Sequence, residues 1–335
     1  MSTATAAPAS VSAWDRVRTY TPPSRYVPVI VTFALFLGMF GVGGLRYEGF
    51  TDPQVFLSLL LDNSFLIVLA VGMTFVILAG GIDLSVGSVL ALSTVIAAKT
   101  LEMGWSPYLS VAAVLATGVL LGLLMGLLIH YFDIQPFIAT LAGLFLARGL
   151  CYLISVEAIP INDPTFSDWA FKSITVGDYF IGWTSIVALL TVAVATYVLA
   201  RTRFGRTVYA IGGSESSAML MGLRVAFTKV GVYVISGFCA SLGGLLFALY
   251  TSSGWSLNAV GMELDAIAAV VIGGTLLTGG RGFVIGSLLG VLVLGTIQTF
   301  ISFDGTLSSW WTRIAIGVLL LVFVVIQRLA TRRQR

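Results

Sequence analysis

Charge, histidine and cysteine are all scarce in this sequence. Charged residues make up 10% of its 335 residues, whereas hydrophobic residues make up 58%. So little charge excludes a soluble globular protein of this size, and no basic cluster is dense enough to indicate nucleic-acid binding. The one histidine, His130, has no cysteine or histidine cluster around it, which excludes a histidine-rich metal site. The two cysteines, Cys151 and Cys239, lie in apolar stretches and are typical of small buried side chains, not of a disulfide.

Motifs for nucleotide binding and for hydrolysis are also missing. None of the three lysines follows a glycine, so the sequence has no G-x-x-x-x-G-K-[ST] phosphate loop. No Ser-His-Asp set stands out either. We therefore expect a chain that binds no cofactor or metal and has no enzymatic activity of its own.

Apolar runs of membrane-spanning length recur from end to end, and they predict an all-α, polytopic integral membrane protein. No convincing cleavage site follows the first run, so we interpret it as an uncleaved span and not as a signal peptide. About ten transmembrane helices are expected, with nine and eleven as alternatives. Residues 84–99 form a short span, and the glycine-rich segment 264–280 is a candidate for partial re-entry. The expected spans are roughly 27–45, 64–80, 84–99, 109–130, 136–155, 179–200, 229–250, 264–280, 283–302 and 311–328.

The positions of lysine and arginine predict the orientation of these spans. With an even number of spans, thirteen of the eighteen basic residues fall on the side that holds both termini, and four fall on the other. Because cytoplasmic loops are enriched in Lys and Arg, we expect a cytoplasmic tail at 1–26, a permease domain at 27–328 with a cytoplasmic loop at about 201–228, and a cytoplasmic tail at 329–335. The four outside residues are Arg46, Lys99, Lys172 and Arg313.

The most informative stretch is 72–98, which reads GMTFVILAGGIDLSVGSVLALSTVIAA. Its apolar run breaks at Gly80-Gly81, carries a single acid at position 83 and then resumes. An acid at membrane depth costs at least a few kcal/mol unless it faces protein, water or the interface, and paired glycines indicate backbone that leaves the helix under the cover of protein. The alternatives are that the acid only caps the next helix, and that the acids near 264 only start an interfacial helix. The candidates for the pathway or its gate are Asn63, Asp83, Ser85, Ser88, Glu263 and Asp265.

A weak internal repeat includes the same break. Residues 76–90 align with residues 275–289 through the pattern L-x-G-G-x(5)-G-S-x-L. Interrupted apolar segments at matching places in two halves indicate a transport pathway. The second copy has Gly282 where the first has Asp83, so the repeat is asymmetric in charge.

The loop at 201–228 contains the signal for a short helix. Ser214 is a suitable cap, Glu215 suits the positive end of the helix, and Gly222 is suited to end it in a left-handed conformation. So small a helix is unable to bury its own apolar side chains, which favours a groove on a partner protein. A helix lying flat on the membrane is the alternative, although the segment lacks the Lys and Arg that such helices carry.

Three stretches resemble the permease subunits of ribose/galactose-type ABC sugar importers. They are GMTFVILAGGIDLSVGSV at 72–89, TRFGRTVYAIGGSESSAMLMG at 202–222 and ELDAIAAVVIGGTLLTGGRG at 263–282. The resemblance extends over nearly the whole chain after the first twenty or so residues. Two further pieces, IPIND at 159–163 and FDGTLSSWWTRIAIG at 303–317, resemble the galactofuranose-importer permease more than the ribose one.

This resemblance implies the ABC importer permease fold and ATP-driven import of a monosaccharide across a bacterial inner membrane. It implies three protein partners besides membrane lipid: a cytoplasmic ABC ATPase that binds ATP and Mg, a second permease that is identical or different, and a periplasmic or extracellular sugar-binding protein. A proton-coupled sugar carrier, or an ABC permease for ribose or galactose, is the alternative. The resemblance also assigns 205–223 to the segment that docks on the ATPase, and the ATPase-coupling candidates are Tyr209, Gly212, Gly213, Ala218, Leu220, Met221 and Gly222.

The charge distribution generates a prediction about topology. Single cysteines placed between 157 and 178 should react with a membrane-impermeant maleimide added to intact cells, because that region carries little positive charge. Single cysteines between 206 and 222 should react only after the membrane is opened. Labelling of the second set in intact cells would overturn the orientation.

Overall fold

The computed structural model describes residues 26–306, 308 and 310–332, and the helical fold class expected from the sequence is confirmed. Most of the two expected tails, including Arg16, Arg18, Arg25, Arg333 and Arg335, lies outside the described residues. The helices are α2 Val27–Arg46, α3 Pro53–Asp62, α4 Ser64–Leu78, α5 Val86–Glu102, α6 Pro107–Tyr131, α7 Pro136–Ile154, α8 Pro164–Phe171, α9 Trp183–Arg201, α10 Arg203–Gly213, α11 Glu215–Leu220, α12 Val225–Thr251, α13 Met262–Ile272, α14 Val284–Asp304 and α15 Trp310–Arg332.

The few strands in the described residues are short and form two antiparallel pairs. Strand β1, Ile159–Pro160, pairs with β4, Ser253–Gly254, and strand β2, Ser173–Val176, pairs with β3, Tyr179–Gly182. Several helices begin as their sequences predict. Proline stands in the first turn of α2, α3, α6, α7 and α8, where the missing N–H costs no hydrogen bond. The Asp52 and Asp163 carboxylates cap α3 and α8.

Six of the described helices are long and apolar enough to cross a membrane: α2, α6, α7, α9, α12 and α14. Helices α3 and α4 together make a seventh candidate, bent by 59° at Asn63. The remaining apolar helices, α5, α13 and the part of α15 at 310–325, are shorter. The expected count of about ten spans is therefore not confirmed.

Two of the expected spans are wrong in part. The helix expected at 264–280 ends at Ile272, and residues 273–283 form turns, because the glycine-rich sequence after Ile272 adopts backbone angles that a helix does not have. The helix expected from 179 begins only at Trp183, because residues 179–182 pair as strand β3.

Helix α12 is the inner helix of the bundle and packs on α4, α5 and α6. Three glycines spaced by four residues on α6 allow its backbone to come close to α12. A Cβ at Gly118 or Gly122 would collide with the Gly237 or Tyr233 carbonyl oxygen, and a Cβ at Gly126 would lie 2.9 Å from the Cα of Val230. Small residues at this spacing therefore form a close-packed seam within the subunit.

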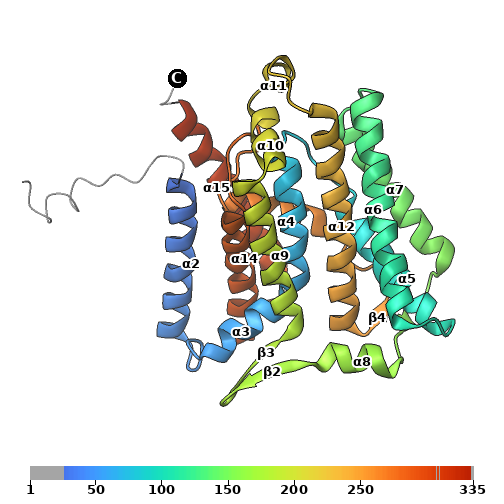
Figure 1. Ribbon diagram of the computed structural model, residues 1–335. Coiled ribbons are helices and arrows are strands. Elements are labelled where there is room, and N and C mark those ends of the chain that lie inside the picture. The colour runs from blue at the N-terminus through green and yellow to red at the C-terminus, as the bar shows by residue number, and fades with distance from the viewer. Residues whose placement is uncertain (1–25, 307, 309, 333–335) are drawn as a thin grey trace, which may run out of the picture.

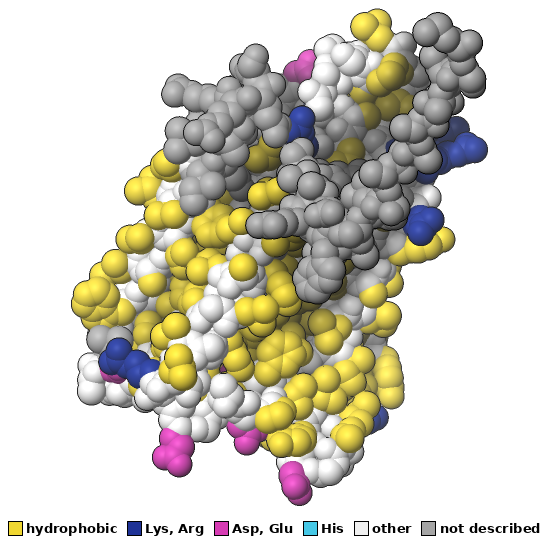
Figure 2. Space-filling model, turned by 90° about the vertical axis from the view of Figure 1, so that its left-hand side faces the viewer, with side chains coloured by type: hydrophobic (Ala, Val, Ile, Leu, Met, Phe, Trp, Pro, Cys, Tyr) yellow, Lys and Arg dark blue, Asp and Glu magenta, His cyan; other side chains and the backbone are white. Residues whose placement is uncertain are grey.

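The two ends of the bundle differ in what they carry (Figure 1). The start of α2, the end of α15, α10 and α11 lie at one end, and α3, α8, β2 and β3 lie at the other. Figure 2 shows one side of the molecule, where hydrophobic side chains cover the middle and charged side chains gather toward the two ends. This distribution matches that of a protein embedded in a bilayer. We refer to the end with α10 and α11 as the inner end and to the opposite end as the outer end.

Candidate functional site

The break predicted at Gly80-Gly81 separates α4 from α5. Helix α4 ends at Leu78, Gly80 turns the chain with φ +82°, and α5 begins at Val86. Asp83 lies within this break and is 2% exposed. One of its carboxylate oxygens accepts hydrogen bonds from the Ser85 backbone N–H at 2.9 Å and from the Ser85 hydroxyl at 2.6 Å, and the other accepts from the Ser236 hydroxyl at 2.7 Å.

These contacts identify the local role of Asp83. The N-cap residue of α5 is Ser85, and the Ser85 hydroxyl donates to Asp83 instead of capping the helix. Ser236 belongs to α12, so the carboxylate ties the break to the inner helix of the bundle. The simple capping alternative is therefore insufficient, while a role of Asp83 in the pathway or its gate stays a prediction.

A second break, at residues 273–283, corresponds to the second copy of the repeat. Gly279 and Gly280 adopt φ values of +83° and +73°, which favour glycine. The Gly280 N–H donates to the Leu78 carbonyl oxygen at 2.9 Å. A Cβ placed on Gly279 would lie 2.9 Å from the Gly80 backbone nitrogen. The two breaks found by the repeat are thus in direct backbone contact.

Helix α10 packs on both breaks. A Cβ at Gly212 would collide with the Leu78 carbonyl oxygen and with the Gly280 backbone nitrogen. The Tyr209 hydroxyl donates to the Gly282 carbonyl oxygen at 2.9 Å. Tyr209 and Gly212 were candidates for contacting a partner, but their contacts lie inside the chain. They connect the inner loop to the two breaks.

Helix α11 follows α10 and forms as its sequence predicts. The Ser214 hydroxyl caps it by accepting from the Ser217 N–H at 3.2 Å. The Glu215 carboxylate lies 2.8 Å from the Lys229 ammonium group on α12, which fixes the start of the helix to the bundle.

The end of α11 determines which of its side chains are accessible. Gly222 has φ +73°, its N–H donates to the Met219 carbonyl, and the Leu223 N–H donates to the Ala218 carbonyl. This Schellman motif folds Leu223 back, and Ala218 is fully buried in a small cluster with Ile211 and Val225. The expectation that Ala218 contacts a partner is wrong for this reason. The exposed apolar side chains are instead Met219, Leu220 and Met221, at 58%, 89% and 67%.

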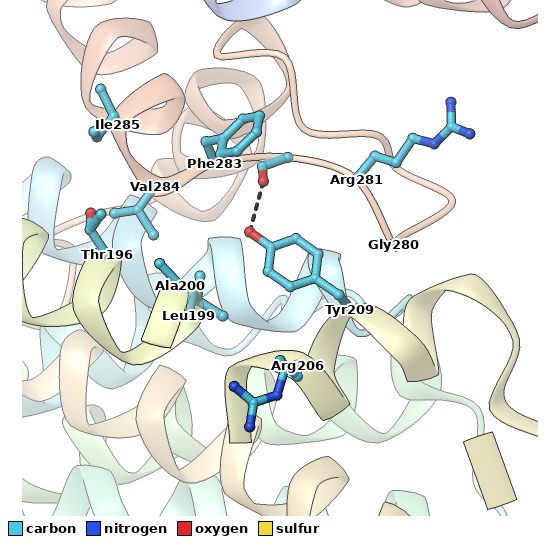
Figure 3. A pocket seen from close by; sticks show the side chains of 11 residues that line it. Thr196, Leu199, Ala200, Arg206, Tyr209, Gly280, Arg281, Phe283, Val284 and Ile285 are labelled. Carbon is cyan, nitrogen blue, oxygen red and sulfur yellow. Dashed lines mark hydrogen bonds between the residues drawn. The ribbon is translucent and has the colours of Figure 1, made fainter. Parts of the chain in front are cut away.

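A cavity of about 400 Å³ lies beside Tyr209, between α9, α10 and residues 280–285. Figure 3 shows the hydroxyl of Tyr209 directed at the Gly282 carbonyl, with Leu199 and Val284 on the adjacent wall. The side chains of Arg206 and Arg281 extend in different directions in this view and do not converge on one point. The cavity leaves space next to the second break.

The remaining sequence candidates lie at other points of the bundle. The buried Asn63 amide donates to the Leu59 carbonyl oxygen at 2.9 Å at the bend between α3 and α4. The Ser88 hydroxyl donates to the Ser85 carbonyl oxygen inside the first turn of α5. At the start of α13, the Asp265 carboxylate pairs with Arg313 at 2.9 Å. Among the remaining candidates, Gly213 is exposed and Glu263 packs on Gly87.

No group of three or more His, Cys, Asp or Glu side chains suited to a metal ion occurs among the described residues. The candidate site lies in an apolar helical bundle. Its two breaks, at 79–85 and 273–283, meet beneath helix α10. Interrupted membrane helices at matching positions of two halves are the arrangement of membrane transport proteins. The fold and the site therefore define the class of membrane permeases.

The chain belongs to the family described as "Branched-chain amino acid transport system / permease component", whose family profile matches residues 55–324. It is 48% identical to the inner membrane ABC transporter permease protein YjfF of Escherichia coli, over 91% of this chain and 92% of that protein. It is 40% identical to the fructose import permease FruG of Bifidobacterium longum, over 91% of each chain. It is 41% identical to the ribose import permease RbsC of Haemophilus influenzae, over 88% of this chain and 91% of that protein. No solved structure matches the chain.

These findings make the chain a multi-pass permease subunit of the sugar ABC transporter type, although the family is described by amino-acid transport. Such subunits are components of transporters and not enzymes. Membership also implies partners of two general kinds, an ATPase and a solute-binding protein.

The hydrogen bonds of Asp83 generate a prediction. In Asp83→Asn the amide keeps one acceptor oxygen for Ser85 but turns an N–H₂ group toward the Ser236 hydroxyl, so the bond that Ser236 donates to position 83 is lost. The difference is about 1 kcal/mol, so we expect a severalfold loss of transport with the complex still assembled. Uptake and co-purification are measured in parallel. Asp52→Asn is the control, because Asp52 only caps α3 and asparagine caps a helix about as well as aspartate. Normal uptake by Asp83→Asn would show that the tie to α12 does not matter for transport.

Proposed function

We propose that this chain forms the translocation pathway of an ATP-driven monosaccharide importer in a bacterial inner membrane, with both termini in the cytoplasm. A separate ABC ATPase supplies ATP and Mg, a second permease completes the membrane unit, and a sugar-binding protein delivers the substrate. The observation that carries the proposal is the continuous contact from α11 through α10 to the two breaks. Through it, a movement at the exposed loop is passed to both interrupted segments.

The contact with the ATPase is assigned to the exposed side of α11. Met219, Leu220 and Met221 give this helix an apolar surface that its own chain does not cover. An apolar helix face of this kind fits a groove on a partner, and Met is well suited to such contacts because its side chain is flexible. The Glu215–Lys229 ion pair fixes α11 to α12, and the Ser214 hydroxyl caps its first turn. A movement of α11 that the ATPase causes would therefore also move the helices that α11 contacts.

Galactofuranose is the proposed sugar. Relatives are named for fructose and ribose import, so import of a monosaccharide is the common theme. The two segments that resemble the galactofuranose permease lie close to one stretch of chain. Ile159 pairs with Gly254 in the small outer sheet, and Arg313 pairs with Asp265. Both segments thus border residues 253–265, which supports a role for them in distinguishing sugars.

The energy source provides the first test. The purified importer in proteoliposomes should take up labelled galactofuranose only when its ATPase, ATP and Mg are present, because this chain has no phosphate loop. Ribose and galactose are measured in the same assay. Uptake by this chain alone under a proton gradient would establish the secondary-carrier alternative, and ATP-driven uptake of ribose in place of galactofuranose would change only the sugar.

The second test concerns α11. Met221→Glu places an unpaired carboxylate in the proposed contact and should weaken docking by a few kcal/mol. Because no membrane helix is altered, we expect normal membrane levels, lost co-purification with the ATPase and no uptake. Phe132→Glu is the matched control, since Phe132 is an exposed apolar residue, at 71%, outside the α10–α11 loop. A Met221→Glu protein that still co-purifies with its ATPase and transports would remove α11 from the coupling role.

A further inference from the structure

Residues 252–261 form an irregular segment that runs from the outer end of the bundle into its interior. The segment leaves α12 at Thr251 and does not become helical until Met262. A Cβ at Gly254 would collide with the Thr94 carbonyl and would lie 2.8 Å from the Cβ of Ala98, so this part packs on the outer half of α5. Its far end reaches the first turn of α5, because a Cβ at Gly87 would lie 3.0 Å from the Ala259 carbonyl oxygen.

The segment therefore reaches well below the surface of the membrane. Positions 98 and 87 of α5 are separated by about 16 Å along the helix axis at the helical rise per residue. This is about half of the roughly 30 Å thickness of the hydrocarbon core. Non-helical backbone at such a depth is tolerated only where protein or water contacts it, never lipid.

An arginine within a membrane helix holds this segment in place. Arg148 lies in α7, and its guanidinium group donates to the carbonyl oxygens of Ser256 and Asn258, the latter at 2.9 Å. The Asn258 side chain also contacts the Thr94 hydroxyl at 3.4 Å. The guanidinium thus provides the hydrogen bonds that backbone carbonyls outside a helix require.

The segment is covered on one side only. Its inward side chains, including Ser256 and Ala259, are buried, whereas Trp255, Leu257 and Val260 are 39%, 47% and 61% exposed. On a regular helix such as α6, exposed leucines are compatible with lipid because the backbone is fully bonded. On an irregular segment at this depth they are not, so the uncovered side must contact water or protein.

We propose that residues 252–264 form a wall of the water-filled sugar pathway in the outer half of the membrane. The Trp255 ring offers an apolar face for the C–H groups of a sugar, and the half-buried side chains of Asn258 and Glu263 offer hydrogen-bonding groups for its hydroxyls. Arg148 is a positioning residue that keeps the wall in register with α5 and α7. This inference rests on the proposed function for the nature of the ligand, but the presence of water at the wall is independent of it.

The test measures water access at the wall. A single cysteine in Leu257→Cys, within the assembled transporter in intact cells, is exposed to a charged, membrane-impermeant methanethiosulfonate. The reagent needs an ionised thiol, so a cysteine in water should react about tenfold faster or more than one in lipid, and the modification should block uptake. Leu120→Cys on α6 is the matched control, because Leu120 is also exposed, at 63%, but on a regular helix. The native Cys151 and Cys239 are buried and give the background.

Three further variants make the result decisive. Val260→Cys repeats the measurement at a second exposed position if Leu257→Cys does not reach the membrane. Arg148→Gln in the Leu257→Cys background should change the labelling rate, because the segment loses its anchor. Glu157→Cys, at an exposed site near the outer end, reports that the reagent is active.

One outcome would overturn the proposed wall. In it, Glu157→Cys is labelled, but Leu257→Cys and Val260→Cys react no faster than Leu120→Cys. That result would indicate that a second protein covers the segment. The labelling rate is measured without sugar, so the test of water access is valid even if galactofuranose is not the substrate.

Discussion

Backbone groups that leave a helix inside a membrane must find hydrogen-bond partners within the protein, and this requirement organises the molecule. The chain leaves helical geometry at 79–85, at 273–283 and at 252–261. The second interruption is bonded to the residue just before the first, because the Gly280 N–H donates to the Leu78 carbonyl oxygen. The third is bonded by the guanidinium of Arg148. Each interruption therefore lies where another part of the chain provides its hydrogen-bond partners.

The same requirement explains why small residues gather at the inner end. Backbone-to-backbone contact needs a separation that a side chain would prevent, and Gly212, Gly279 and Gly280 leave that space where α10 meets both breaks. Close approach makes the junction stiff, because no flexible side chain lies between the two surfaces. Under the proposed function, a displacement of α11 would therefore pass through α10 to the breaks.

Local sequence patterns predicted the first break, the cap of α11 at Ser214 and its end at Gly222, because each depends on residues a few positions apart. They did not predict that Ala218 is buried or that Tyr209 bonds to Gly282, since both depend on how the chain folds back on itself. The helix expected at 264–280 was too long because apolar composition persists after Ile272 while the backbone turns. Arg148 is a charge within the span expected at 136–155, but its partners are backbone carbonyls, which carry no signal in the sequence.

The asymmetry of the internal repeat distinguishes the roles of its two breaks. Position 83 carries a carboxylate that bonds to Ser236, so the first break is fixed to the inner helix α12. The matching position 282 is a glycine, whose carbonyl accepts from Tyr209 on α10. The first break is thus anchored to the bundle and the second to the loop that faces the proposed ATPase contact. The cavity of about 400 Å³ lies beside the second break. Under the proposed function, the second break is therefore the part that would move, and the first break is the fixed surface against which it would move.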